Sequence, residues 1–187
     1  MNYAKLPTEK PNPRSRNIDR LPVEKILGIM NQEDAKVPRA VARVRRNIAQ
    51  AVTLIVTRLK KGGQIFFAGA GTSGRLGILE AAECPPTFNT ALSLVQAVIA
   101  GGKKAVFRSQ EGAEDRRDQG YKIFSRKIRA KDVLIGIAAS GVTPFVAGAL
   151  EAARGKKAAT VLIACNARSP LKSSVDCLIS PKTGPEV

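Results

Sequence analysis

Histidine is absent from this chain of 187 residues, and so is tryptophan. Without histidine, the chain lacks the usual imidazole base, the serine–histidine relay and the commonest transition-metal ligand. Acid–base chemistry therefore falls to carboxylates, or to Lys, Tyr or Cys side chains. The three cysteines, Cys84, Cys165 and Cys177, show no CxxC spacing, which indicates neither a disulfide framework nor a zinc site. We expect no metal and no cofactor.

Long apolar runs and aromatic residues are also scarce. No run reaches the roughly 18–20 residues that cross a bilayer, and the N-terminus lacks the apolar core of a secretory signal. These features favour a cytoplasmic protein without a membrane partner. The net charge of +16 suggests nucleic-acid binding, but only 4% of residues are aromatic and the basic residues are spread along the chain. We therefore expect the charge to steer small anions rather than to bind nucleic acid as its main role.

The first third of the sequence predicts a helical arm. Residues 1–20 are rich in Pro and Arg and are predicted to be extended. A short helix is expected over Pro22–Met30. A long amphipathic helix is expected to follow, from Glu33 to a stop at Gly62-Gly63, because apolar residues recur at intervals of three and four. We therefore expect the chain to consist of a helical arm, residues 1–61, and a domain, residues 62–187.

The remaining two thirds alternate between apolar strands and helices. The strands are continuously apolar, as in a parallel sheet that is covered on both faces. They are expected at Gln64–Ala68, Leu94–Ile99, Val133–Ala138, Thr160–Ala164 and Cys177–Ser180. Helices are expected at Gly74–Ala82, Glu111–Lys127, Pro144–Ala153 and Leu171–Ser174. The sequence thus predicts an α/β fold, a doubly wound parallel five-stranded sheet flanked by helices.

A glycine-rich segment, Gly69 to Gly77, joins the first strand to the next helix. Gly71, Thr72 and Ser73 offer backbone N–H groups and hydroxyls at a helix N-terminus, which suits a phosphate or sugar phosphate. A nucleotide P-loop is excluded because Gly-Lys-Ser/Thr is missing. A dinucleotide site would need an acidic residue after the next strand, and the sequence has none there. The alternative is that the segment serves only as a tight strand-to-helix turn and binds no ligand.

A second polar loop follows the third strand. Ser140 and Thr143 carry hydroxyls, and Gly141 lets the backbone turn toward a ligand. Taken alone, this loop is more typical of a simple Ser/Thr helix cap than of a ligand site. Two such loops at one sheet edge could surround a phosphate together.

Two glutamates follow these elements. Glu83 precedes Pro85-Pro86, and we expect the prolines to end the helix there. Glu114 is expected at the start of a helix, where it could be only a partner of the helix dipole. A catalytic pair would require both acids to lie near the two polar loops.

Blocks of sequence resemble the N-acetylmuramic acid 6-phosphate etherase family, which carries a sugar isomerase (SIS) domain. The resemblance runs through almost the whole chain. It rests on Leu6-Pro7-Thr8-Glu9, Ile18-Asp19, Gly69 to Gly77, Ala82 to Phe88, Ala100-Gly101-Gly102, Glu111 to Asp115, Ala139-Ser140-Gly141 and Gly184-Pro185-Glu186.

The resemblance implies a homodimer that cleaves the D-lactyl ether of N-acetylmuramic acid 6-phosphate by elimination and hydration. Glu83 would be the acid and Glu114 the base. Thr72, Ser73, Ser140 and Thr143 would hold the phosphate or sugar. Val142 and Glu80 replace the family's usual Arg and Asp, and the family continues beyond Gly-Pro-Glu, which suggests a C-terminally truncated member. A non-catalytic sugar-phosphate sensor on the same fold is the alternative, and a basic nucleic-acid-binding protein is a third.

Overall fold

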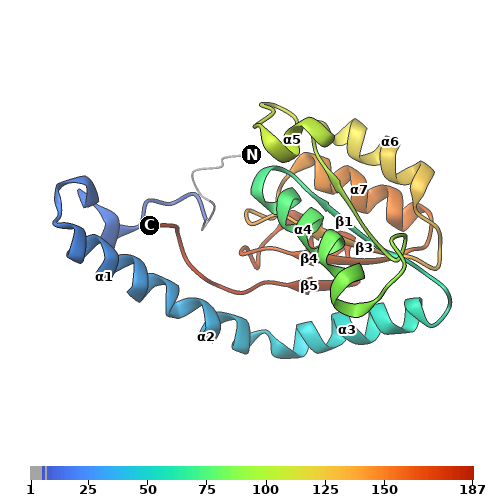
Figure 1. Ribbon diagram of the computed structural model, residues 1–187, viewed down its shortest axis with the longest axis horizontal. Coiled ribbons are helices and arrows are strands. Elements are labelled where there is room, and N and C mark those ends of the chain that lie inside the picture. Colours follow the sequence, from blue (N-terminus) through green and yellow to red (C-terminus); the bar gives the residue numbers. More distant parts are fainter. Residues whose placement is uncertain (1–5, 7) are drawn as a thin grey trace.

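The computed structural model describes residue 6 and residues 8–187 and shows a helical arm joined to an α/β domain (Figure 1). Within its described residues, the arm contains two 3-10 turns, Pro13–Ser15 and Ile18–Arg20, at positions where the sequence predicts an extended chain. The part of that expectation that concerns residues 1–5 and 7 lies outside the described residues. Three consecutive helices follow; in Figure 1 the last of them lies below the domain, and the first two extend away from it to the left. They are α1 (Val23–Asp34), α2 (Lys36–Arg43) and α3 (Arg45–Leu59).

The expected long helix is interrupted at Val44. There the backbone leaves the helical region (φ −102°, ψ 14°), and the Val44 N–H bonds to the Val41 carbonyl oxygen three residues back. The predicted stop is confirmed, because α3 ends at Leu59 and Gly62 takes a positive φ of 71°. The boundary at residue 62 stays a prediction, although α3 packs on the sheet through Ala51 and bonds to it through Asn47.

The sheet has five parallel strands in the order β2-β1-β3-β4-β5. Each of them lies within one residue of its predicted position. They are β1 (Ile65–Gly69), β2 (Val95–Ile99), β3 (Val133–Ile137), β4 (Ala159–Ile163) and β5 (Cys177–Ile179). The order confirms the predicted doubly wound sheet: β2 is added on one side of β1, and β3, β4 and β5 are added on the other, so the switch point lies between β1 and β3.

Helices cover both faces of the sheet. On one face, α6 (Arg117–Lys127) and α7 (Pro144–Gly155) bury Phe66, Leu134 and Leu162 of the strands. The Phe124 ring of α6 meets the Phe66 ring edge-on at 6.3 Å between centroids. On the other face lie α3 and α4 (Gly71–Phe88), against the alternate strand side chains. This two-sided burial is the reason why the strands are apolar throughout.

Two further helix predictions need correction, and one short helix has no counterpart among the predictions. The helix expected at Glu111–Lys127 begins only at Arg117, because residues 109–116 form a loop. A short helix that was not predicted, α5, spans Lys103–Phe107. The helix expected at Gly74–Ala82 is longer at both ends, and its consequences for the site are given below.

Candidate active site

The two polar loops meet at the switch point of the sheet. β1 and β3 are adjacent and in register, with Gly69 opposite Ile137, so the residues that follow both strands emerge at the same edge. The loop after β1 leads into α4, and the loop after β3 leads into α7. Ligands of open α/β sheets bind outside the carboxyl ends of the strands at such a point. The structure therefore brings together the two segments that the sequence proposed for a phosphate.

The first loop is shorter than expected, because α4 begins at Gly71 rather than Gly74. Gly71, Thr72 and Ser73 form its first turn, and their N–H groups have no acceptor within the helix. Neither hydroxyl caps the helix, since the N-cap is Ala70. Close packing explains the early start. A Cβ on Gly74 would lie 2.5 Å from Ile99 Cγ1 and 2.9 Å from the Gly69 carbonyl oxygen. Glycine thus lets the first turn rest directly on the strands.

The second loop is held rigidly from behind. Ser169 Oγ donates to the Gly141 carbonyl oxygen at 2.5 Å, and Asn166 Nδ2 donates to the Ser140 carbonyl oxygen at 3.0 Å. Gly141 takes a φ of 71°, where a Cβ would also lie 2.8 Å from Ser169 Cβ. These two bonds hold the carbonyl groups of Ser140 and Gly141 against the segment that follows β4.

Glu114 faces the second loop across a shared cavity. The Phe145 N–H, in the first turn of α7, donates to the Glu114 carbonyl oxygen at 2.9 Å. The cavity has a volume of about 440 Å³ and is also bordered by Glu9, Asp115, Ser140, Val142, Thr143 and Pro144. Glu114 lies in a loop and not in a helical turn, so its expected position at a helix start is wrong. Ser140, Thr143 and one predicted acid therefore border the same cavity, whereas Gly71, Thr72 and Ser73 do not border it.

Glu83 does not border this cavity. It lies on the exposed side of α4, twelve residues after Gly71, which corresponds to about 18 Å along the helix axis. The expected helix end at Glu83 is wrong, because α4 continues through Pro85 and Pro86 to Phe88. Pro85 and Pro86 have no N–H groups to donate to the carbonyl oxygens of Ala81 and Ala82, four residues back. Ala81 is half-buried and Ala82 is exposed, so water can reach this part of the helix. Within one chain, the two glutamates are thus not neighbours.

The sequence reasoning missed four residues of this site. Glu9 and Asp115 add two carboxylates to the cavity, and Asn166 and Ser169 fix the second loop. Asn166 and Ser169 could have been found, because they follow β4 at the same carboxyl edge of the sheet. Glu9 could not, because it comes from the arm, far away in sequence.

Two classes of site find no support in the part of the chain that the structure describes. Its His, Cys, Asp and Glu side chains form no group of three that could hold a metal ion. No helix among the described residues combines the length and the apolar character that a membrane crossing requires.

The sheet order and the two loops at its switch point define a sugar isomerase (SIS) domain. The chain belongs to the family of the glucokinase regulatory protein N-terminal SIS domain, whose family model matches residues 47–154. Among curated proteins, the chain is 49% identical over 183 residues to an N-acetylmuramic acid 6-phosphate etherase of Thermosynechococcus vestitus. It is 48% identical over 182 residues to N-acetylmuramic acid 6-phosphate etherase 2 of Vibrio cholerae. These matches confirm the resemblance.

Each match covers 97% of this chain but only 59% of the relative, so the chain spans about three fifths of their length. Solved structures agree on the fold. A phosphoheptose isomerase from Francisella tularensis superposes with a TM-score of 0.65 over 83% of this chain and 85% of its own, at 17% identity. The NanR protein of Vibrio vulnificus, complexed with ManNAc-6P, gives a TM-score of 0.58 over 91% of this chain and 58% of its own, at 15% identity.

Proposed function

We propose that this chain carries the sugar-phosphate site of an N-acetylmuramic acid 6-phosphate etherase. The reaction converts its substrate to N-acetylglucosamine 6-phosphate and D-lactate. One observation carries the proposal: Glu114 shares a cavity with Ser140 and Thr143, the hydroxyl residues suited to the phosphate. The names of the curated relatives support the same reaction. The proposal also places the reaction in the cytoplasm, in the recycling of N-acetylmuramate from peptidoglycan.

The 6-phosphate would bind between the first turn of α4 and the loop before α7. Gly71, Thr72 and Ser73 supply N–H groups and hydroxyls, and the N-terminal end of the α4 dipole adds a favourable field. Ser140 and Thr143 contribute hydroxyls from the other side, with Gly141 shaping the loop. This donor set suits a phosphate without needing a bound cation.

The chemistry would be an elimination followed by a hydration. In the open-chain sugar, the aldehyde acidifies the proton on C2, and Glu114 removes this proton. The C3–O bond then breaks, a C2–C3 double bond forms, and Glu83 protonates the departing lactate oxygen. Water adds its hydroxyl to C3 and a proton to C2, which restores the saturated sugar. Each positioned proton-transfer group contributes on the order of 10²–10⁴ in rate.

A homodimer would supply Glu83 to this cavity from a second copy of the chain. The helix face that carries Glu83 supports this arrangement. Leu76 and Leu79 precede Glu83 at intervals of three and four residues, so all three share one face. Both leucines are about half exposed, at 51% and 53%. A partner that buried this apolar stripe would also receive Glu83.

Mixed variants test the function and the shared site together. We expect the purified chain to release D-lactate from N-acetylmuramic acid 6-phosphate, and Glu83→Gln and Glu114→Gln each to abolish release. If each site uses one acid from each copy, co-folding the two variants in equal amounts should restore about one quarter of the activity, because half of the dimers would hold one intact site. No recovery would contradict the shared site. Substrate binding without any lactate would favour the non-catalytic sensor, and an absence of binding would refute the proposal.

A further inference from the structure

A second cavity lies beside the loop of Ser140, at the carboxyl ends of β4 and β5, and has a volume of about 470 Å³. Three separate segments form its walls: the arm, the turn after β4 and the segment after β5. The bordering residues are Leu6, Lys10, Cys165, Asn166, Ala167, Arg168, Lys182 and Gly184. Neither the expected phosphate site nor either predicted acid lies in it.

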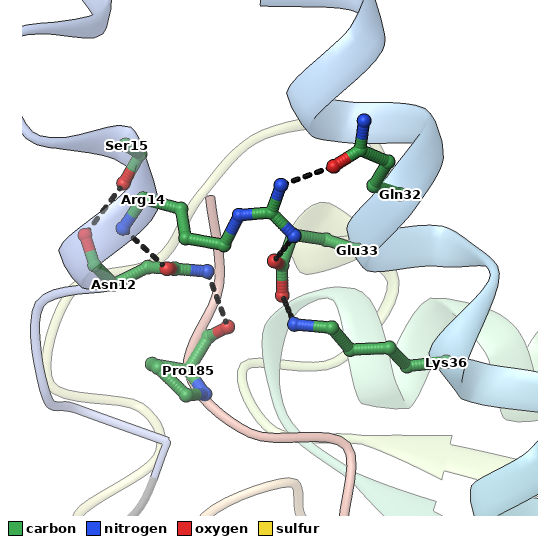
Figure 2. Close-up of polar contacts among 7 residues, drawn as sticks. All are labelled: Asn12, Arg14, Ser15, Gln32, Glu33, Lys36 and Pro185. Carbon is green, nitrogen blue, oxygen red and sulfur yellow. Dashed lines mark hydrogen bonds and ion pairs between the residues drawn. The ribbon is translucent and has the colours of Figure 1, made fainter.

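Polar contacts hold the arm against the segment after β5. Asn12, only 6% exposed, donates through Nδ2 to the Pro185 carbonyl oxygen at 3.4 Å (Figure 2). Two residues further along the arm, Arg14 pairs with Glu33 of α1 at 3.2 Å, and Lys36 pairs with the same carboxylate. These contacts place Lys10 on one wall of the cavity and Lys182 on another.

The charge of this cavity is one-sided. Lys10, Arg168 and Lys182 are its charged residues, and no carboxylate borders it. Within the described part of the chain, none of these three cations lies within ion-pair distance of an acidic side chain. The neighbouring cavity of Ser140 has the opposite sign, with three carboxylates on its walls. The three cations would therefore attract an anionic group to the second cavity, whereas the phosphate would depend on the N–H groups and hydroxyls of the two polar loops.

The two cavities share one wall. Asn166, which borders the cationic cavity, holds the Ser140 carbonyl at 3.0 Å, and the Cys165 N–H donates to the Ala139 carbonyl oxygen at 2.8 Å. A ligand whose phosphate binds the Ser140–Thr143 loop can therefore extend another group past this wall. We infer that Lys10, Arg168 and Lys182 receive the carboxylate of the lactyl substituent. This inference rests on the proposed function, in which the substrate carries a phosphate and a carboxylate.

A comparison of two ligands tests this assignment. N-acetylglucosamine 6-phosphate has the same phosphate as N-acetylmuramic acid 6-phosphate but no lactyl carboxylate. Binding of both is measured by calorimetry in the Glu114→Gln background, which prevents turnover. In K10Q/R168Q/K182Q we expect affinity for N-acetylmuramic acid 6-phosphate to fall roughly tenfold to hundredfold, as for lost charge-assisted hydrogen bonds. Affinity for N-acetylglucosamine 6-phosphate should stay within about twofold, because the phosphate loop is unchanged.

A control with the same loss of charge is K122Q/R126Q/K127Q, on the exposed side of α6. It should bind both ligands as the parent does. An equal loss for both ligands in the cavity variant, or no loss for either, would overturn the inference. If the parent bound neither ligand, the proposed function itself would fail, which is a different result.

A second measurement does not depend on any cavity variant. Cys165 borders the cationic cavity and is half-buried, so a ligand there should shield its thiol. We expect N-acetylmuramic acid 6-phosphate to slow alkylation of Cys165 more than N-acetylglucosamine 6-phosphate does at equal occupancy. Equal protection by both ligands would also contradict the assignment.

Discussion

The packing of α6 against α7 can be tested by substitution, because the two helix backbones approach closely at two glycines, Gly120 and Gly148, which have no Cβ. A Cβ on Gly148 would lie 2.1 Å from the Arg117 carbonyl oxygen, whereas ordinary contact begins at 3.4 Å. The two helices would have to part by about 1.3 Å at this point. Gly120 faces α7 in the same way, at 2.1 Å from the Phe145 carbonyl oxygen. The obstacle is backbone in both cases, so no change of rotamer relieves it.

We therefore expect Gly148→Ala to destabilise the protein. Overpacking of this kind costs about 1–3 kcal/mol, and a backbone obstacle argues for the upper end. Alanine gains about 1 kcal/mol of helix propensity over glycine, which leaves a net loss of about 2 kcal/mol. For a chain of this size, that corresponds to a fall in Tm of roughly 4–8 °C.

Gly155→Ala is the matched control. It is the same substitution in the same helix, but a Cβ there meets nothing within 4 Å. We expect its Tm to stay level or to rise by at most roughly 2–4 °C, because Gly155 ends α7 and the helix-propensity gain of about 1 kcal/mol applies in full only inside a helix. Calorimetric scans of the two variants and the parent give the comparison. Equal stability of the two variants would refute the reasoning that close backbone approach, rather than flexibility, requires Gly148.

Two further predictions concern titratable groups outside the site. A hydrogen bond from Lys36, followed by the charges of Lys36 and Arg14, lowers the pKa of the Glu33 carboxyl below its ordinary value of 4.5. Because the pKa is lowered, the contacts of Glu33 with Lys36 and Arg14 stabilise the fold fully above about pH 4.5 and lose this effect as the pH falls through the pKa of the folded protein. Protection of the α1 amides against hydrogen exchange should therefore decrease over this pH range. Glu33→Gln, which lacks the carboxylate, should not show this decrease. Burial raises the pKa of the Cys177 thiol, whose Sγ donates to the Asn47 carbonyl oxygen at 3.3 Å. Iodoacetamide at pH 8 should therefore modify Cys84 and Cys165 before Cys177, and equal rates would contradict this.

The strands were predictable because each is a short apolar run between turn residues. A parallel sheet with two covered faces requires such runs, and few other structures use several of them in alternation with helices. Helix ends were less predictable. Pro85 and Pro86 signal a stop locally, yet α4 continues because its lost hydrogen bonds fall where water reaches the helix. Residues 109–116 do not form the expected first turns of α6. Their loop is fixed instead by the bond from the Phe145 N–H to Glu114, a contact distant in sequence.

The site shows the same division. Ser140, Gly141 and Thr143 could be proposed from sequence, because a polar loop after an apolar strand marks the carboxyl edge of the sheet. Glu114 was proposed for its chemistry by family resemblance, and the structure places it on the same cavity. Lys10 and Lys182 could not be grouped in advance, because 172 positions separate them and the contact of Asn12 with Pro185 joins their segments.

The sequence by itself determined the alternation of strands and helices and the residue types at each loop, since these follow from local patterns of polarity and backbone preference. Only the tertiary structure decided which side chains share a cavity and which of the described charged side chains form ion pairs. The strand order brings the loops after β1 and β3 to one point and separates Glu83 from Glu114 within a chain. Such distances depend on the packing of segments far apart along the polymer, which no local pattern records.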